Sequence, residues 1–216
     1  MRTGNLSEEY RTIELTMIRH GQTPSNYSHR YLGWREEDLT GEAEEALKKI
    51  KMQGIWNEPE LLFASPMRRC IRTAELLFPG KEMLFIPEWK EICFGRFEGK
   101  TYQELADDPA YQAWIDSNGT LPFPEGESQE TFCTRVQSGY AAMCRKIAER
   151  EKPVSGDKAA FPAAAVVHGG TIMALMSALF GGDYFSYQVK NNQGYVLTLH
   201  DTGSGRLRAE SYRRLA

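Results

Sequence analysis

The 216-residue sequence predicts an α/β fold, in which three layers (α/β/α) surround a mostly parallel central sheet. Strand-like runs alternate with helix-like runs along the chain, and two of the strand-like runs end in His-Gly. Only the last two strand candidates, 195–199 and 207–212, form a hairpin, which predicts one antiparallel edge strand. Ligands in such folds bind outside the carboxyl ends of the strands. The residues that follow each strand are therefore the candidates for a functional site.

Local signals define four elements in the first half of the chain. Residues 13–18 (IELTMI) and 61–64 (LLFA) are the strand candidates. Thr40 is a capping residue for a helix over 40–52, in which glutamates come early and lysines late, as the helix dipole favours. Pro66 stands in the first turn of a helix predicted over 66–78. Residues 1–12 are expected to form an N-terminal arm.

The second half repeats the alternation after a mixed region. Residues 84–86 form a short strand candidate, and 98–127 are expected to be a helical insertion over the active site. The helix over 128–150 has the clearest apolar face, and a linker over 152–158 follows it. A strand over 163–167 and an apolar helix over 171–180 precede the hairpin. We expect residues 1–216 to form one domain.

Composition excludes several classes of protein. Lys and Arg total 26 against 29 Asp and Glu, so the net charge of −3 argues against a nucleic-acid partner. The sequence has no apolar run of the ~18 residues that a membrane span needs and no secretory signal, so we expect a cytoplasmic protein without a membrane partner. The four cysteines form no CxxC pair and are expected to be free thiols. A homodimer stays an open alternative.

Two histidines occupy equivalent places in the pattern. Arg19-His20-Gly21 and His168-Gly169-Gly170 each follow an apolar strand and precede a predicted helix start. Backbone N–H groups at a helix start bind anions, and the same position disfavours an imidazolium, which keeps the histidine neutral and nucleophilic. One alternative is a pair of hydrogen-bonded structural histidines. A metal site is the other, but no HxH, HExxH or HxxxD motif lies nearby, so no metal is expected. Arg19 suits phosphate oxygens better than a metal.

An arginine cluster follows the second strand. Arg68, Arg69 and Arg72 all lie away from the apolar stripe of the predicted helix. A solvated helix face would look the same, so helical phase alone does not select one of them. Their location at the ligand edge favours the first turn.

A carboxylate cluster follows the third strand. Glu88, Glu91 and Glu98 alternate there with aromatic residues and glycines. A surface loop is one interpretation. The other is a structured turn that holds one carboxyl in a partly dry site, where it acts as a general acid.

Taken together, six segments occur in an order that resembles the histidine phosphatase superfamily, the phosphoglycerate mutase-like enzymes. They are MIRHGQTPSN (17–26), RYLGWREEDLTGEAEEAL (30–47), SPMRRCIRTAELL (65–77), WKEICFGRFEGKTYQEL (89–105), PEGESQETFCTRV (124–136) and VVHGGTIMALM (166–176). The resemblance covers most of residues 13–180 and is closest to α-ribazole phosphatases and broad-specificity phosphatases. It implies a two-step phosphoryl transfer through a phosphohistidine, with no metal and no cofactor.

The resemblance also implies a role for individual residues. His20 is then the nucleophile, Glu91 the acid that protonates the leaving oxygen and later activates water, and Arg19, Arg69 and His168 the rest of the phosphate pocket. Arg69 is chosen because it occupies the arginine position of the family five residues before Ala74. The implied substrate-binding residues are Thr23, Asn26, Gly33 and Gly169.

One segment bears on which member of the family the chain resembles. The mutases carry a longer insertion with basic residues before the GES segment, whereas residues 106–123 contain no Lys or Arg. This difference favours a phosphatase acting on a small phosphorylated metabolite such as α-ribazole-5′-phosphate. The alternatives are a cofactor-dependent phosphoglycerate mutase and a non-catalytic phosphate-binding module. Tyr111, Trp114 and Phe123 either line an apolar substrate wall or belong to the core.

Overall fold

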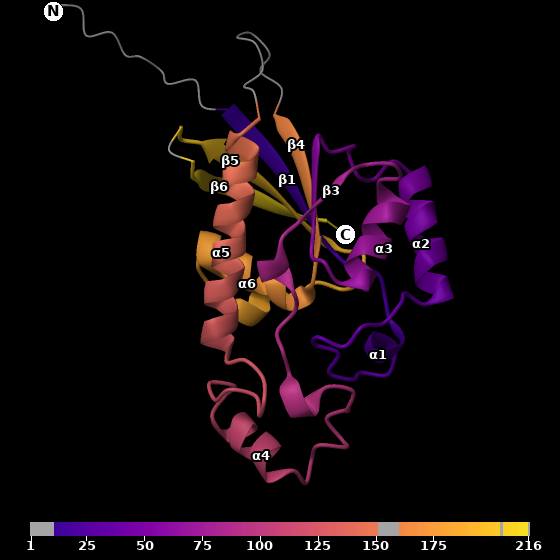
Figure 1. Ribbon diagram of the computed structural model, residues 1–216, viewed down its shortest axis with the longest axis vertical. Coiled ribbons are helices and arrows are strands. Elements are labelled where there is room, and N and C mark those ends of the chain that lie inside the picture. The colour runs from indigo at the N-terminus through magenta and orange to yellow at the C-terminus, as the bar shows by residue number, and fades with distance from the viewer. Residues whose placement is uncertain (1–10, 151–159, 204, 216) are drawn as a thin grey trace, which may run out of the picture.

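A six-stranded sheet forms the centre of the computed structural model, which describes residues 11–150, 160–203 and 205–215 (Figure 1). The strands are β1 (Arg11–Arg19), β2 (Leu61–Ala64), β3 (Met83–Phe85), β4 (Phe161–Val167), β5 (Gly194–Asp201) and β6 (Leu207–Leu215), in the order β3-β2-β4-β1-β5-β6. The pairs β3/β2, β2/β4 and β4/β1 are parallel, and β5 is antiparallel to both of its neighbours, β1 and β6. The predicted α/β class with a mostly parallel sheet is confirmed.

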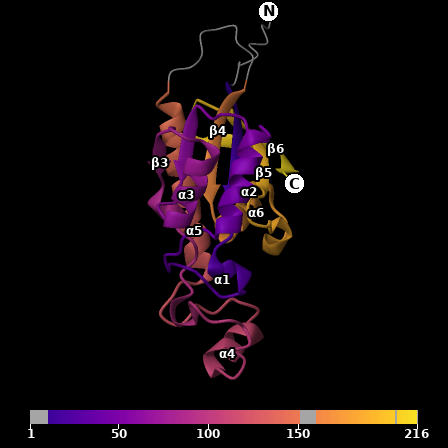
Figure 2. The same ribbon diagram turned by 90° about the vertical axis from the view of Figure 1, so that its right-hand side faces the viewer.

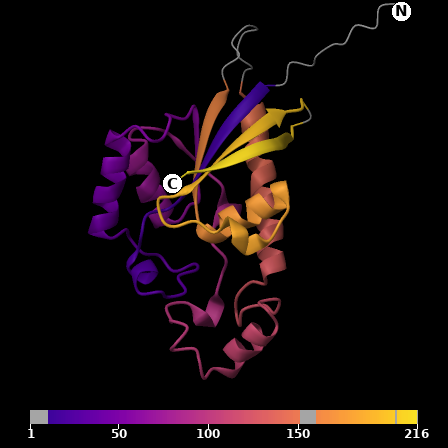
Figure 3. The same cartoon turned by 180° about the vertical axis from the view of Figure 1, so that it is seen from behind.

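Helices cover both faces of this sheet. They are α1 (Pro24–Tyr27), α2 (Gly41–Met52), α3 (Arg68–Leu77), α4 (Pro109–Asp116), α5 (Gln129–Ala148) and α6 (Gly169–Phe180). Figures 1 and 3 show α2 and α3 on one side of the sheet and α5 and α6 on the other. Figure 2, turned by 90°, shows α2 and α3 in front of the strands.

The two faces of the sheet belong to two apolar clusters because side chains alternate along a strand. In β1, Ile13 and Met17 join the cluster beneath α5 and α6, whereas Ile18 joins the cluster beneath α2 and α3. In β4, Ala165 and Ala164 divide between the clusters in the same way.

Capping residues fix two helix starts, those of α2 and α5, close to where the sequence predicts them. The Thr40 hydroxyl accepts from Ala43 N at 3.2 Å, and Ser128 does the same for α5. Helix α3 differs, because it begins at Arg68 after an N-cap at Met67 that makes no side-chain cap bond, so Pro66 lies outside the helix. Helix α6 begins at Gly169, two residues before the start predicted from the apolar pattern.

Three expected segments differ from the structure or lie outside it. Arg11 and Thr12, which we expect in the arm, pair in β1 instead. Residues 1–10 and the predicted linker 152–158 lie outside the described residues. In residues 98–127, all of which are described, α4 is the single α-helix and turns form much of the rest. Figure 1 shows α4 beyond the carboxyl ends of the strands, at the same end as α1.

The aromatic residues of this insertion pack against one another. Tyr111 stacks on Trp114 with ring centroids 5.9 Å apart, and Trp114 lies 5.0 Å from Phe123. Tyr111 and Phe123 are buried in the larger apolar cluster. Core packing is therefore the better of the two interpretations of these residues.

Two further expectations concern thiols and membranes. All four cysteines are free, with Cys70 and Cys144 buried and Cys93 and Cys133 partly exposed. Across the described ranges, no helix combines the length and the apolar character that crossing a bilayer requires.

Candidate active site

Parallel pairing of β1 with β4 brings the two predicted histidines together. Arg19 and Val167 are the last paired positions of the two strands, so His20 and His168 follow at the same edge. Their ring centroids lie 5.2 Å apart, edge to face. Both side chains are buried, with exposed fractions of 3% and 0%. Residues separated by 148 positions thus form one site, as expected for the carboxyl edge of a parallel sheet.

Backbone contacts hold the imidazole of His20 in one tautomer. Its Nδ1 lies 2.7 Å from the carbonyl oxygen of Gly21, and because a carbonyl only accepts, Nδ1 carries the proton. Nε2 therefore keeps its lone pair. Burial, followed by the charges of Arg69 and Arg19, lowers the pKa of His20 well below 6.5. Near neutral pH His20 is therefore an uncharged imidazole with a free nucleophilic nitrogen.

His168 has a more enclosed environment as the N-cap residue of α6. Its Nε2 lies 2.8 Å from the Ser65 hydroxyl and 3.5 Å from the Cys70 thiol. Burial, then the charge of Arg69, lowers the pKa of His168 well below 6.5. Near neutral pH His168 is therefore uncharged, as the sequence predicts for both histidines.

The predicted reason for a neutral histidine, a helix start next to it, is present at His168 and absent at His20. Helix α6 starts directly after His168, whereas α1 starts four residues after His20 and has only four residues. Burial and the neighbouring arginines are the main causes of both pKa shifts instead.

Burial selects one arginine from the cluster that helical phase left open. Arg69 is wholly buried, whereas Arg68 is exposed and pairs with Asp38. Arg72 pairs with Glu44 through two hydrogen bonds of 2.6 and 3.0 Å. The phase argument therefore failed for Arg69, which points inward although it lies off the predicted stripe.

Two guanidinium groups stand at the histidines with incomplete hydrogen bonding. Arg69 donates to the carbonyl oxygens of Gly33 at 2.8 Å and Arg35 at 3.0 Å, and Arg19 donates to that of Val189 at 2.7 Å. The Nε of each arginine is buried without a partner. Buried donors are rarely left unpaired, so two such cations form a suitable site for an oxyanion.

Gly33 is a backbone support of Arg69. It adopts φ +57°, and a Cβ there would lie 2.0 Å from Oε1 of Glu98, so only glycine fits. Its carbonyl accepts from Arg69. The contact of Gly33 with substrate stays a prediction, and the structure adds this positioning role.

Thr23 and Asn26 form a reciprocal cap on α1. Asn26 N donates to Thr23 Oγ1 and Thr23 N donates to Asn26 Oδ1, each at 3.3 Å. Asn191 donates to the same Asn26 oxygen at 3.1 Å and to the carbonyl of His20 at 2.9 Å. The Asn26 oxygen is therefore engaged within the protein. Phosphate binding by Thr23 and Asn26 stays a prediction.

The carboxylate of Glu91 lies on the first turn of α6. Gly170 N donates to Oε2 at 3.2 Å, and Ile92 N donates to Oε1 at 3.0 Å. A Cβ on Gly170 would lie 2.3 Å from Oε1, so the carboxylate occupies the space of the missing side chain. A Cβ on Gly169, the first residue of α6, would lie 3.4 Å from Arg19 Nε. The carboxylate therefore shares this helix start with Arg19 and His168.

A second carboxylate of the cluster builds the loop. Glu98 accepts from the backbone N of Trp34 at 2.8 Å and of Phe94 at 3.1 Å. It therefore joins two loops at the edge of the site, whereas Glu91 enters it.

Sequence reasoning missed three residues that hold this site. Ser65 contacts His168, Asn191 contacts His20, and Thr73 accepts from Gly21 N at 2.9 Å. Ser65 directly follows a strand, so its position was a usable signal. Asn191 and Thr73 had no such signal, because only the tertiary structure brings them to residues 20 and 21.

A polar cleft opens beside Arg19. Its volume is about 610 Å³, and amides and cations dominate its lining, including Arg19, Gln22, Asn26, Lys190, Asn191 and Asn192. Such a lining suits a polar or charged small molecule. Among the described residues, no group of three or more His, Cys, Asp or Glu is arranged to hold a metal ion.

Comparison with known proteins agrees with this geometry. Residues 15–210 match the family model of the histidine phosphatase superfamily (branch 1). The chain therefore belongs to the histidine phosphatase superfamily, whose members are phosphatases or mutases.

Two relatives in sequence are named phosphoglycerate mutases. The chain is 27% identical over 193 residues to the 2,3-bisphosphoglycerate-dependent phosphoglycerate mutase of Bifidobacterium longum (strain DJO10A), covering 78% of this chain and 77% of the mutase. It is 31% identical over 144 residues to the same-named enzyme of Corynebacterium diphtheriae, covering 61% of this chain but only 57% of that enzyme.

Solved structures resemble the whole fold. The alpha-ribazole phosphatase from Shigella flexneri superposes with a TM-score of 0.74 at 21% identity, covering 92% of this chain and 95% of that one. The protein TTHB049 from Thermus thermophilus is 32% identical with a TM-score of 0.62, covering 94% of this chain and 99% of that one.

Proposed function

We propose that the protein is a metal-independent phosphatase that hydrolyses a small phosphomonoester through a phosphohistidine, without a cofactor. One observation carries the proposal. The Nδ1 proton of His20 is bound to the Gly21 carbonyl, which leaves Nε2 free beside two buried guanidinium groups with unpaired donors. A neutral nucleophile next to preorganised cations is what phosphoryl transfer requires.

The first step transfers the phosphoryl group to the enzyme. His20 Nε2 attacks phosphorus while the bond from phosphorus to the ester oxygen breaks. Arg19 and Arg69 stabilise the charge that spreads over the phosphoryl oxygens. The protonated carboxyl of Glu91 gives its proton to the leaving oxygen, so the products are an alcohol and phosphohistidine.

The second step releases phosphate. Water attacks the phosphorus of phosphohistidine, and the Glu91 carboxylate takes the proton that the water loses. The N–P bond breaks, and its electron pair returns to His20. The enzyme regains a neutral histidine and a protonated Glu91, and inorganic phosphate leaves.

The proposed substrate is a small phosphorylated metabolite, with α-ribazole-5′-phosphate as the first to test. Support comes from the insertion, where residues 106–123 contain no Lys or Arg, and from the fold shared with the Shigella flexneri protein. A cytoplasmic location without a membrane partner is part of the proposal, and the near-neutral composition supports the absence of a nucleic-acid partner. A homodimer is compatible with the proposal.

Phosphoglycerate mutase is the second candidate because the Bifidobacterium relative bears that name. The polar cleft beside Arg19 also suits a charged substrate. A mutase uses the same phosphohistidine but passes its phosphoryl group to a second alcohol instead of water. The two functions therefore differ in the acceptor.

The test distinguishes the two acceptors of the phosphoryl group, water and a second alcohol. Purified protein is assayed for phosphate release from a panel of phosphorylated metabolites, and for conversion of 3- to 2-phosphoglycerate with 2,3-bisphosphoglycerate added. Phosphate release is the expected activity, and robust mutase turnover would replace the proposal with the second candidate. No turnover in either assay would favour the non-catalytic phosphate-binding module.

Variants then assign the nucleophile. His20→Ala is expected to abolish both hydrolysis and acid-labile ³²P labelling. His200→Asn is the control, because His200 pairs with Glu210 and lies opposite Thr12, at the far end of β1. Hydrolysis that survives His20→Ala would exclude His20 as nucleophile. Inhibition by a chelator that Zn²⁺ reverses would contradict a metal-independent reaction.

A further inference from the structure

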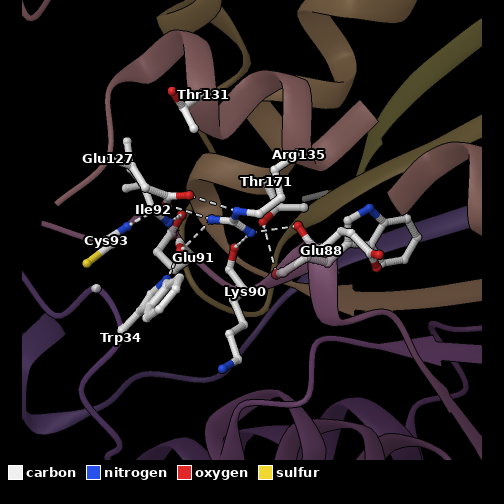
Figure 4. Close-up of polar contacts among 12 residues, drawn as sticks. Trp34, Glu88, Lys90, Glu91, Ile92, Cys93, Glu127, Thr131, Arg135 and Thr171 are labelled. Atoms are coloured by element: carbon white, nitrogen blue, oxygen red, sulfur yellow. Dashed lines mark hydrogen bonds and ion pairs between the residues drawn. The ribbon is translucent and has the colours of Figure 1, made fainter. Parts of the chain in front are cut away.

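One arginine outside the phosphate pocket holds the backbone that carries Glu91. Arg135, from α5, donates through Nη1 to the carbonyl oxygens of Glu88 at 2.7 Å and Lys90 at 3.0 Å. Its Nη2 donates to the carbonyl oxygen of Glu91 itself at 3.2 Å. Figure 4 shows the guanidinium at the centre of these contacts. A single side chain thus fixes three carbonyl groups of one loop.

Glu127 completes the coordination of this guanidinium. It accepts from Arg135 Nε at 2.8 Å and from Nη2 at 2.7 Å, a two-bond pair that also sets the plane of the guanidinium. Its Oε2 also accepts from Cys93 N at 2.9 Å, on the far side of Glu91. The side chains of Arg135 and Glu127 are only 21% and 14% exposed. The pair is therefore shielded from the solvent screening that weakens surface ion pairs.

A second donor, from another loop, binds the carbonyl oxygen of Glu91. Trp34 Nε1 donates to the Glu91 carbonyl at 2.7 Å. Trp34 lies between Gly33 and Arg35, the two residues whose carbonyls bind Arg69. The backbone of the acid is thus tied to the loop that orients the phosphate-binding arginine.

Fixing the backbone on both sides limits where the Glu91 carboxylate can reach. With that backbone held, the side chain meets Gly170 N in the first turn of α6. Loss of the hydrogen bonds from Arg135 would let the loop that carries Glu91 shift. Displacement of a catalytic group by about 1 Å can cost about 100-fold in rate. We propose that Arg135, oriented by Glu127, is the positioning residue for Glu91 as general acid, an inference that rests on the proposed phosphatase function.

A positioning role and a purely structural role predict different kinetics. A general acid matters most when the leaving oxygen is strongly basic, as in an alkyl phosphate. It matters little for p-nitrophenyl phosphate, whose leaving group departs as an anion. Loss of fold stability lowers the active fraction and reduces both rates equally.

The experiment measures kcat/KM of the full-length protein for p-nitrophenyl phosphate and glycerol 3-phosphate. The variants are Arg135→Met, the milder Arg135→Lys and Glu127→Gln, and Glu91→Gln alone and combined with Arg135→Met. Lysine keeps the charge but cannot make the forked contacts. Arg72→Met is the matched control, because Arg72 makes an equivalent two-bond pair with Glu44 elsewhere.

Each Arg135 variant is expected to lose at least about tenfold more activity on glycerol 3-phosphate than on p-nitrophenyl phosphate, and the same is expected of Glu91→Gln. Arg72→Met should leave the ratio of the two rates unchanged. In the Glu91→Gln background, Arg135→Met should add little further loss on glycerol 3-phosphate, because both changes act on one step.

Equal losses on both esters, or additive losses in the double variant, would overturn the positioning role while leaving the phosphatase function in place. If Arg135→Met does not fold, Arg135→Lys and Glu127→Gln decide by the same ratio. Wild-type protein that hydrolyses neither ester would overturn the proposed function, and the inference with it.

Discussion

Replacing Gly170 with alanine should separate activity from stability. The added Cβ would lie 2.3 Å from Glu91 Oε1, whereas ordinary contacts begin at 3.4 Å. The carboxylate must therefore move by about 1 Å, a displacement that can cost about 100-fold in rate. We expect kcat/KM for an alkyl phosphate to fall by about that factor.

The same change should affect the fold little. Gly170 is the second residue of α6 and has no positive φ, so alanine is compatible with the backbone. Replacing glycine with alanine at a compatible φ stabilises by about 0.4–1 kcal/mol through the unfolded chain, which offsets crowding against the ring of Phe132, 3.2 Å from the new Cβ. The free energy of unfolding should therefore change by no more than about 1 kcal/mol.

Steady-state kinetics with glycerol 3-phosphate and urea unfolding measure the two effects. Gly41→Ala is the control, because Gly41 is the first residue of α2 and its Cβ would meet nothing within 4 Å. Activity of Gly170→Ala within about threefold of wild type would refute the placement of the Glu91 carboxylate, because a shift of about 1 Å should cost far more. A large loss of stability would refute the claim that the defect is local.

Three further outcomes test other parts of the site. The pKa of His168 is lowered from 6.5 in the folded protein, so below pH 6.5 the unfolded chain binds one more proton and the free energy of unfolding falls as the pH falls. His168→Asn should reduce the slope of the free energy of unfolding against pH by on the order of 1.4 kcal/mol per pH unit, measured by urea unfolding at several pH values. Gly33→Ala should weaken inhibition by inorganic phosphate, measured as an increased Ki, because its Cβ would meet Glu98 and shift the carbonyl that holds Arg69. Burial raises the pKa of the Cys70 thiol, so iodoacetamide should not label Cys70 in the native protein. Unfolding should make Cys70 reactive, which mass spectrometry of the labelled peptides detects.

Local signals were enough for most elements of the fold. Thr40 and Ser128 cap helices where predicted, because capping depends on a few neighbouring residues. The alternation of strands and helices indicated a mostly parallel sheet, because each strand and helix is also defined by the periodicity of a few neighbouring residues. A predicted boundary was wrong at Pro66, because α3 starts two residues later, where Arg68 N donates to Glu36 Oε2 at 3.0 Å from another segment.

The site was predictable to the extent that strand ends mark it. The prediction that ligands gather at the carboxyl edge led to His20 and His168, which the structure places with ring centroids 5.2 Å apart. Choosing Arg69 and Glu91 required the family resemblance, since helical phase left three arginines open and the loop offered three glutamates.

By itself, the sequence determined the strands, the capped helices and the two His-Gly strand ends, because hydrogen bonding and hydrophobic periodicity act over a few residues. Only the tertiary structure decided which arginine is buried, that burial is the main cause of the lowered pKa of His168, and that Arg135 holds the backbone of Glu91. Burial and pKa depend on everything packed around a group, and that environment comes from chain segments far apart in the sequence.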